Sequence, residues 1–264
     1  MSRQEILEQL ADQHEAQLKS TLRDLEEEIL SSISRATGGS ELIDTRIAIE
    51  LRKDIKRHLQ ETYLFVSDKL VRDYDKVVNE FIKEFGALKI PDKFKSLTQI
   101  DLQTITALKN QAFSGFEDLA NRYLSEISGN VYANAIAGRP FREMVKDIKA
   151  KITGEVDVRG RSMSTYAGQI AHDSVMQFDG QFTVYKAKSS GLKSFKYTGT
   201  LVETTRDFCR RHVGNTYNEK QIRAIWTGNW SGKSSGDPFI VRGGYRCRHT
   251  WLPVDKDWDI NDIK

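Results

Sequence analysis

The chain has 264 residues, of which 39% are hydrophobic and 29% are charged, and this composition is typical of a protein that folds in water. Its apolar runs last only a few residues, whereas a helix that crosses a membrane needs roughly 20. Two cysteines are too few for a framework of disulfides, and the first residues lack the basic and then apolar pattern of a secretory signal. We therefore expect no membrane span and a protein kept in a reducing cytosol.

The charge is distributed unevenly along the chain. The whole chain carries a net charge of +3, but residues 181–254 contain 13 Lys and Arg against four Asp and Glu, so this segment carries +9 and the remainder −6. A basic segment of this size predicts contact with a polyanion such as double-stranded DNA, bound without regard to its sequence. The alternative is an ordinary solvated surface. The candidate nucleic-acid-binding residues are Arg210, Arg211, Arg242, Arg246 and Arg248.

The first 137 residues are predicted to form long helices. Apolar residues recur at helical spacing between residues 4 and 35, Gly38 and Gly39 end this pattern, and Ser40 is a candidate cap for a second helical pattern that extends to Phe85. A third pattern begins at Thr98, whose spacing to Asp101 predicts a capping box. The apolar stripes predict packing in a helical bundle or against sister subunits. In the second case the chain would self-associate through its N-terminal helices. The stripe of the first pattern contains Leu18, Leu22, Leu25, Ile29 and Ile33.

Residues 138–264 are predicted to form a second region of mixed structure. Pro140 begins a short helix, a loop through Gly160 follows, and a longer helix ends at Gly191, where a left-handed cap is expected. Beyond it the pattern predicts a strand over 192–200, a short helix capped by Thr204, a helix from Asn218 and two short strands around a Gly-Gly turn within 237–254. The predicted fold class is α+β and predominantly helical, with a region 1–137 of long helices and a region 138–264 that ends in a small mixed module.

Both cysteines lie in this module, and each has a histidine close behind it. Cys209 and His212 are three residues apart, which brings their side chains to one face of a helix, and Cys247 and His249 are two apart, which brings theirs to one side of a strand. Two thiolates and two imidazoles suit a tetrahedral, structural Zn²⁺ site. The alternatives are two buried thiols that act as small apolar groups with two surface histidines, a disulfide between Cys209 and Cys247, and a Cys/His nucleophile pair.

Four segments between 166 and 254 carry a resemblance to a known family. They are YAGQIAHDSVMQFDGQF, GLKSFKYTG, TTRDFCRRHVGNTY and GGYRCRHTWLPV, in that order. Together they resemble the phage head morphogenesis family, the Mu F-type minor head proteins, with Cys209, Cys247 and Arg248 in the expected order. Where many relatives carry a second cysteine in each pair, this chain has His212 and His249, and it lacks the histidine-proline step often found before the last motif.

The resemblance implies a structural, non-enzymatic minor head protein of a tailed bacteriophage. Such a protein would associate with the portal protein or the major capsid protein, assist head assembly, DNA packaging or DNA delivery, and lie in the head interior or at the portal vertex after assembly in the host cytoplasm. An alternative is a DNA-binding or nuclease-like protein injected with the genome, built around His212 and His249. A host DNA-binding adaptor is a third. The chain contains no HExxH motif and no phosphate-binding glycine loop.

Overall fold

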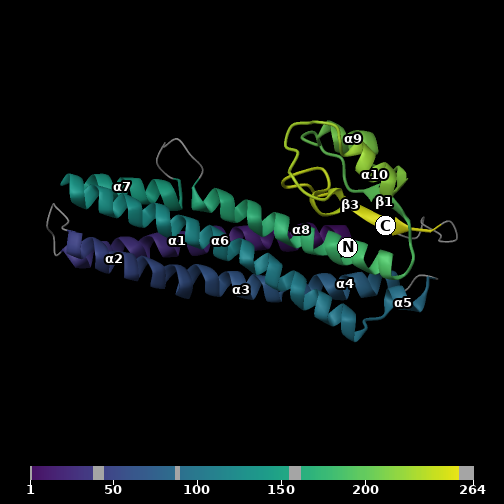
Figure 1. The fold of residues 1–264 in the computed structure, drawn as a ribbon, viewed down its shortest axis with the longest axis horizontal. Helices are drawn as coiled ribbons and strands as arrows, with labels where there is room; N and C mark the ends of the chain where they lie inside the picture. Colours follow the sequence, from purple (N-terminus) through teal and green to yellow (C-terminus); the bar gives the residue numbers. More distant parts are fainter. Residues whose placement is uncertain (1, 38–44, 87–89, 155–161, 256–264) are drawn as a thin grey trace. The chain divides into compact units, whose positions relative to one another are not determined.

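The computed structural model describes residues 2–37, 45–86, 90–154 and 162–255. It is predominantly helical and carries a small antiparallel sheet near the C-terminus, so the α+β prediction is confirmed (Figure 1). No described helix has an apolar stretch long enough to cross a membrane. The expected cap at Ser40 and the loop through Gly160 lie outside the described residues. The helices before the sheet are α1 (Arg3–Thr37), α2 (Thr45–His58), η1 (Leu59–Leu64, a π-helix), α3 (Phe65–Arg72), α4 (Tyr74–Gly86), α5 (Asp92–Lys95), α6 (Gln99–Ala137), α7 (Phe141–Ile152) and α8 (Met163–Ser189).

The described chain forms two compact units, each assembled from separate stretches of sequence. Unit 1 contains residues 1–12, 72–112 and 172–264, and unit 2 contains residues 13–71 and 113–171. The sequence predicts a single division of the chain, between residues 137 and 138. The units divide it elsewhere, because long-range packing between helices is not visible as a change in local composition.

Unit 2 is a helical unit with an apolar interior. The stripe of α1 that the sequence analysis identified, from Leu18 to Ile33, is fully buried in the single chain. Tyr63 of η1 packs edge-on against Phe116 of α6, with ring centroids 6.4 Å apart. Polar contacts join the helices as well, since the Thr62 hydroxyl donates to Glu28. The stripe therefore packs within its own chain, and it is not available for self-association with a sister subunit.

The helical part of unit 1 has an aromatic interior with an ion pair buried beside it. Arg3 of α1 contacts the carboxylates of Asp179 and Glu84, and both the arginine and Asp179 are almost completely buried. The Arg3 guanidinium also lies 5.2 Å from the centroid of Phe81. This pairing compensates the burial of charge inside an apolar environment. The aromatic residues of this interior are Tyr74, Phe81, Phe85, Phe94, Phe178 and Phe182.

The start of α6 confirms the predicted capping box. The Thr98 hydroxyl accepts a hydrogen bond from the Asp101 backbone N–H, and the Asp101 carboxylate accepts one from the Thr98 backbone N–H. Buried Lys186 of α8 donates to the same carboxylate at 3.0 Å and to two backbone carbonyls. Burial by itself raises the pKa of Asp101, but the hydrogen bonds from Thr98 and Lys186 outweigh it and the pKa is lowered.

We expect Asp101→Asn to destabilise unit 1 by about 2 kcal/mol at neutral pH, because Lys186 loses its charged partner. The pKa of Asp101 is lower in the folded chain than in the unfolded one. The contribution of Asp101 to the free energy of unfolding is therefore complete above the usual aspartate pKa, and it is lost as the pH falls through the depressed pKa of the folded chain. Denaturant unfolding of both proteins at neutral pH and at successively lower pH should show their difference shrinking. Exposed Asp92 gives the control, because Asp92→Asn should be neutral throughout; a pH-independent difference for Asp101→Asn would contradict the assignment.

The C-terminal part of unit 1 contains a three-stranded antiparallel sheet in the order β2-β1-β3. Its strands are β1 (Ser194–Thr198), β2 (Thr216–Asn218) and β3 (Thr250–Val254), and Ser194 of β1 pairs with Asn218 on one side and Val254 on the other. β1 confirms the predicted strand, and Gly191 before it has the expected left-handed backbone, with φ 81°. We call residues 192–255 the C-terminal module.

Three short helices complete the C-terminal module: α9 (Asp207–His212), α10 (Glu219–Ile225) and α11 (Pro238–Val241). The helix from Asn218 is confirmed, and Asn218 forms a capping box with Gln221. Two predictions are wrong. Arg206, not Thr204, precedes the first turn of α9, and 238–241 is a helix rather than a strand, because Asp237 accepts a hydrogen bond from the Phe239 N–H and Pro238 occupies the first turn.

Candidate metal centre

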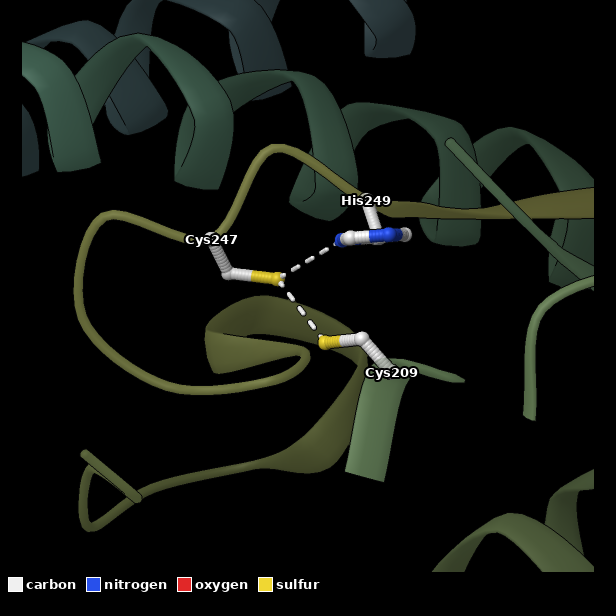
Figure 2. Close-up of side chains that lie close together, drawn as sticks. All are labelled: Cys209, Cys247 and His249. Carbon is white, nitrogen blue, oxygen red and sulfur yellow. Dashed lines mark hydrogen bonds between the residues drawn. The ribbon is translucent and has the colours of Figure 1, made fainter. Parts of the chain in front are cut away.

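Cys209, Cys247 and His249 form a buried cluster in the C-terminal module (Figure 2). Cys209 belongs to α9, whereas Cys247 and His249 belong to the segment that leads from α11 into β3. The two sulfurs are 3.9 Å apart, and the Cys247 Sγ lies 3.7 Å from the His249 Nδ1. Figure 2 shows the three side chains pointing toward one another. The fold therefore brings together groups that are 38 residues apart in the sequence.

Glycines give the backbone room to approach this cluster. A Cβ at Gly243 would lie 2.4 Å from the Cys209 Sγ and 2.9 Å from the Cys247 Sγ. Both distances are shorter than the contacts that Cβ atoms make in folded proteins. A Cβ at Gly199, just after β1, would lie 2.6 Å from the His249 Cδ2. Neither contact can be relieved without moving the cluster, so both positions require glycine.

Hydrogen bonds and burial distribute charge unequally between the two sulfurs. The Gly243 backbone N–H donates to the Cys247 Sγ at 3.2 Å, and the Tyr197 hydroxyl lies 3.4 and 3.5 Å from the Cys209 and Cys247 sulfurs. Interaction with Cys209, and then with His249, lowers the pKa of Cys247 well below its usual value. The same pairing with Cys247, together with burial, raises the pKa of Cys209. Cys247 is therefore the first thiol of the pair to become a thiolate, the form that ligates metals.

The donor types of the cluster and the two separations that involve Cys247 fit a tetrahedral metal ion, and all three ligand atoms lie within 4.8 Å of one another. Metal distances of about 2.3 Å to sulfur and about 2.05 Å to nitrogen would place two sulfurs about 3.8 Å apart and a sulfur and a nitrogen about 3.6 Å apart. The observed 3.9 and 3.7 Å lie within 0.2 Å of these values, whereas a disulfide needs about 2.05 Å. Both cysteines are free, and the buried Nε2 of His249 has no hydrogen-bond partner among the described residues. Cys209, Cys247 and His249 can hold a metal ion.

His212, the fourth ligand expected from the sequence, does not join the cluster. Its Nδ1 lies 2.7 Å from the Tyr217 hydroxyl, and its ring packs against Phe208. Burial, and then the neighbouring Arg211, lower the pKa of His212, which keeps the imidazole neutral at physiological pH. Spacing alone correctly pairs Cys247 with His249 but not Cys209 with His212, because α9 ends at His212 and the chain turns away there.

The cluster lines a pocket of about 860 Å³ that opens at the surface of the C-terminal module. Cys209, Cys247 and His249 form part of its wall, together with Arg206, at the start of α9, and Glu8 of α1. Arg206 and Tyr197 were not predicted from the sequence. The Gly-Gly step before Cys247 was a visible sign that the backbone passes close to other atoms there. Residues that carry a hydroxyl group also line the pocket, namely Thr200, Thr204, Thr205, Ser231 and Tyr245.

The five arginines expected to contact nucleic acid differ in exposure. Arg210, Arg211, Arg246 and Arg248 are exposed, although Arg248 forms ion pairs with Glu8 and Asp12. Arg242 is only 1% exposed, and its guanidinium donates to the Met176 carbonyl. The expectation that Arg242 contacts a polyanion is therefore wrong. This residue instead ties the segment before Cys247 to α8.

No protein-family model, no curated protein and no solved structure matches the chain.

Proposed function

We propose that the chain is a structural minor head protein of a tailed bacteriophage, with a C-terminal module held in shape by zinc. The observation that carries the proposal is the meeting of Cys209 with Cys247 and His249, because these residues come from the two segments with the most specific resemblance to head morphogenesis proteins. A module whose distant segments share a metal needs no catalytic residue to account for its cysteines. The role proposed is therefore non-enzymatic.

Zinc is the metal that this donor set favours. Two thiolates and one imidazole are soft to intermediate ligands, which bind Zn²⁺ in preference to Mg²⁺ or Ca²⁺, and the arrangement requires no redox chemistry. The metal would link α9 to the segment before β3, so its binding energy would add to the stability of the C-terminal module. The Tyr197 hydroxyl contacts both sulfurs and would hold the two ligands in position.

The surface of the chain offers two kinds of contact for an assembly. Exposed Arg210, Arg211 and Arg246 lie in the basic C-terminal module and suit the phosphates of packaged double-stranded DNA. Exposed apolar side chains on the helices, such as Phe65, which is 55% exposed, and Ile136, which is 77% exposed, suit contacts with the portal or major capsid protein.

The proposal predicts that the chain is a component of phage heads. Mass spectrometry of gradient-purified heads from cells that produce the encoding phage should detect it at low copy number, retained after high-salt washing. Absence from both heads and procapsids would refute the assignment.

His212→Ala addresses the nuclease alternative, since a nuclease built on this residue would lose DNA cleavage while keeping its fold and its metal.

A further inference from the structure

We propose that the metal centre of the C-terminal module has an open fourth coordination position, which takes an oxygen of a phosphate group bound in the adjoining pocket. The inference rests on the proposed metal site and gives it a ligand. Within the described part of the chain only Cys209, Cys247 and His249 gather in this cluster, whereas a closed structural site needs four protein ligands. Three protein ligands beside an accessible cavity are the arrangement of metal sites that bind an external ligand.

The pocket reaches the metal site directly. All three ligand residues belong to its wall, so a molecule that enters from the surface meets the cluster. His212, the other candidate ligand of this region, is hydrogen-bonded to Tyr217 and does not line the pocket. A volume of about 860 Å³ accommodates a phosphate group together with the molecule that carries it.

Arg206 gives the pocket its preference for an anion. Its guanidinium donates to the Tyr245 carbonyl and lies 4.8 Å from the centroid of the Tyr245 ring, and none of the described carboxylates lies within ion-pair distance of it. Arg206 and Cys209 both belong to the wall of this pocket. Arg248, in contrast, is paired with Glu8 and Asp12. Arg206 therefore has guanidinium charge available for an oxyanion beside the metal.

A phosphate group matches this combination of donors better than a neutral ligand. One oxygen would complete the tetrahedral shell, and others would accept hydrogen bonds from Arg206 and from hydroxyls of the wall such as Ser231 and Thr204. Two zinc-bound thiolates already balance the charge of the metal, so the added anion depends on the arginine. The phosphate has two sources that share this chemistry, namely inorganic phosphate and the terminal phosphate of a nucleic-acid strand.

Cobalt substitution of the full chain tests this inference. Co²⁺ in a tetrahedral site with two thiolates has visible absorption bands that respond to exchange of the fourth ligand, and the metal content is measured separately in the same sample. Titration with inorganic phosphate should change these bands with saturation while one cobalt per chain is retained. A 5′-phosphorylated dinucleotide and its unphosphorylated form then distinguish the two sources of phosphate.

Two variants make the test specific. Arg206→Gln should raise the phosphate dissociation constant at least about tenfold without loss of cobalt. Arg211→Gln, a change of equal charge on the exposed side of α9 and outside the pocket wall, should leave it unchanged. If cobalt binds but phosphate leaves the bands unaltered, extracts the metal, or binds both variants equally, the inference is overturned and the proposed zinc site stands. Failure to bind cobalt would overturn the metal site itself.

Discussion

Replacing Cys247 by serine should abolish metal binding and lower the stability of the C-terminal module by at least about 3 kcal/mol. Serine has nearly the shape of cysteine but supplies no thiolate, and Cys247 lies at the centre of the cluster, within 3.9 Å of both other ligand atoms. We expect the metal content to fall from about one equivalent to below about 0.2. Elemental analysis of protein purified without chelator, together with thermal unfolding with and without added zinc, measures both effects.

His212→Ala is the matched control for this experiment. It removes an imidazole from the same module, but this imidazole contacts the Tyr217 hydroxyl and the Phe208 ring and not the cluster. The variant should retain its full metal content and lose only the hydrogen bond to Tyr217 and the ring contact with Phe208, together about 1 to 2 kcal/mol. Equal metal loss in both variants would show that His212 is a ligand and that the three-residue cluster is incomplete.

Gly243→Ala should be nearly as disruptive although it removes no ligand. The added methyl group would lie 2.4 Å from the Cys209 sulfur and 3.1 Å from the Tyr197 hydroxyl, so the sulfurs must separate or the segment must shift. We expect a loss of about 1 to 3 kcal/mol, the usual cost of overpacking a core, together with an at least roughly tenfold weaker metal affinity. Competition with a chromophoric chelator measures the affinity, and denaturant unfolding measures the stability.

Gly228→Ala provides the comparison within the same module. Its Cβ would meet no atom closer than 3.6 Å, and the backbone there is not in the left-handed region. This variant should keep the stability and the metal affinity of the parent chain. An unchanged metal affinity in Gly243→Ala would mean that the backbone at residue 243 does not lie as close to the two sulfurs as the structure places it.

The helices and the first strand could be predicted from the sequence because their signals are local. Thr98 and Asp101 form a capping box four residues long, and the stripe from Leu18 to Ile33 has the period of a helix. The assignment failed at 238–241, where the apolar run FIV suits a strand by composition. There the hydrogen bond from Phe239 to Asp237 and the ring of Pro238 favour a helical turn.

The candidate site was predictable in part, for a related reason. The spacing of Cys247 and His249 places two candidate ligands within one segment, and this is visible in the sequence alone. The contribution of Cys209 without His212 depends on where α9 ends and on the hydroxyl of Tyr217, which lies in the next strand. Arg206 and Tyr197 reach the cluster only through the fold. Local sequence therefore identifies the donors, and tertiary structure decides which of them share a site.

X-ray absorption at the zinc edge, on the full chain purified without chelator, tests the metal centre most directly. The account predicts one zinc per chain with two sulfurs at about 2.3 Å, one imidazole nitrogen at about 2.0 Å and one further light atom from outside the chain. Less than about 0.2 equivalents of zinc, or a shell without sulfur, would contradict it.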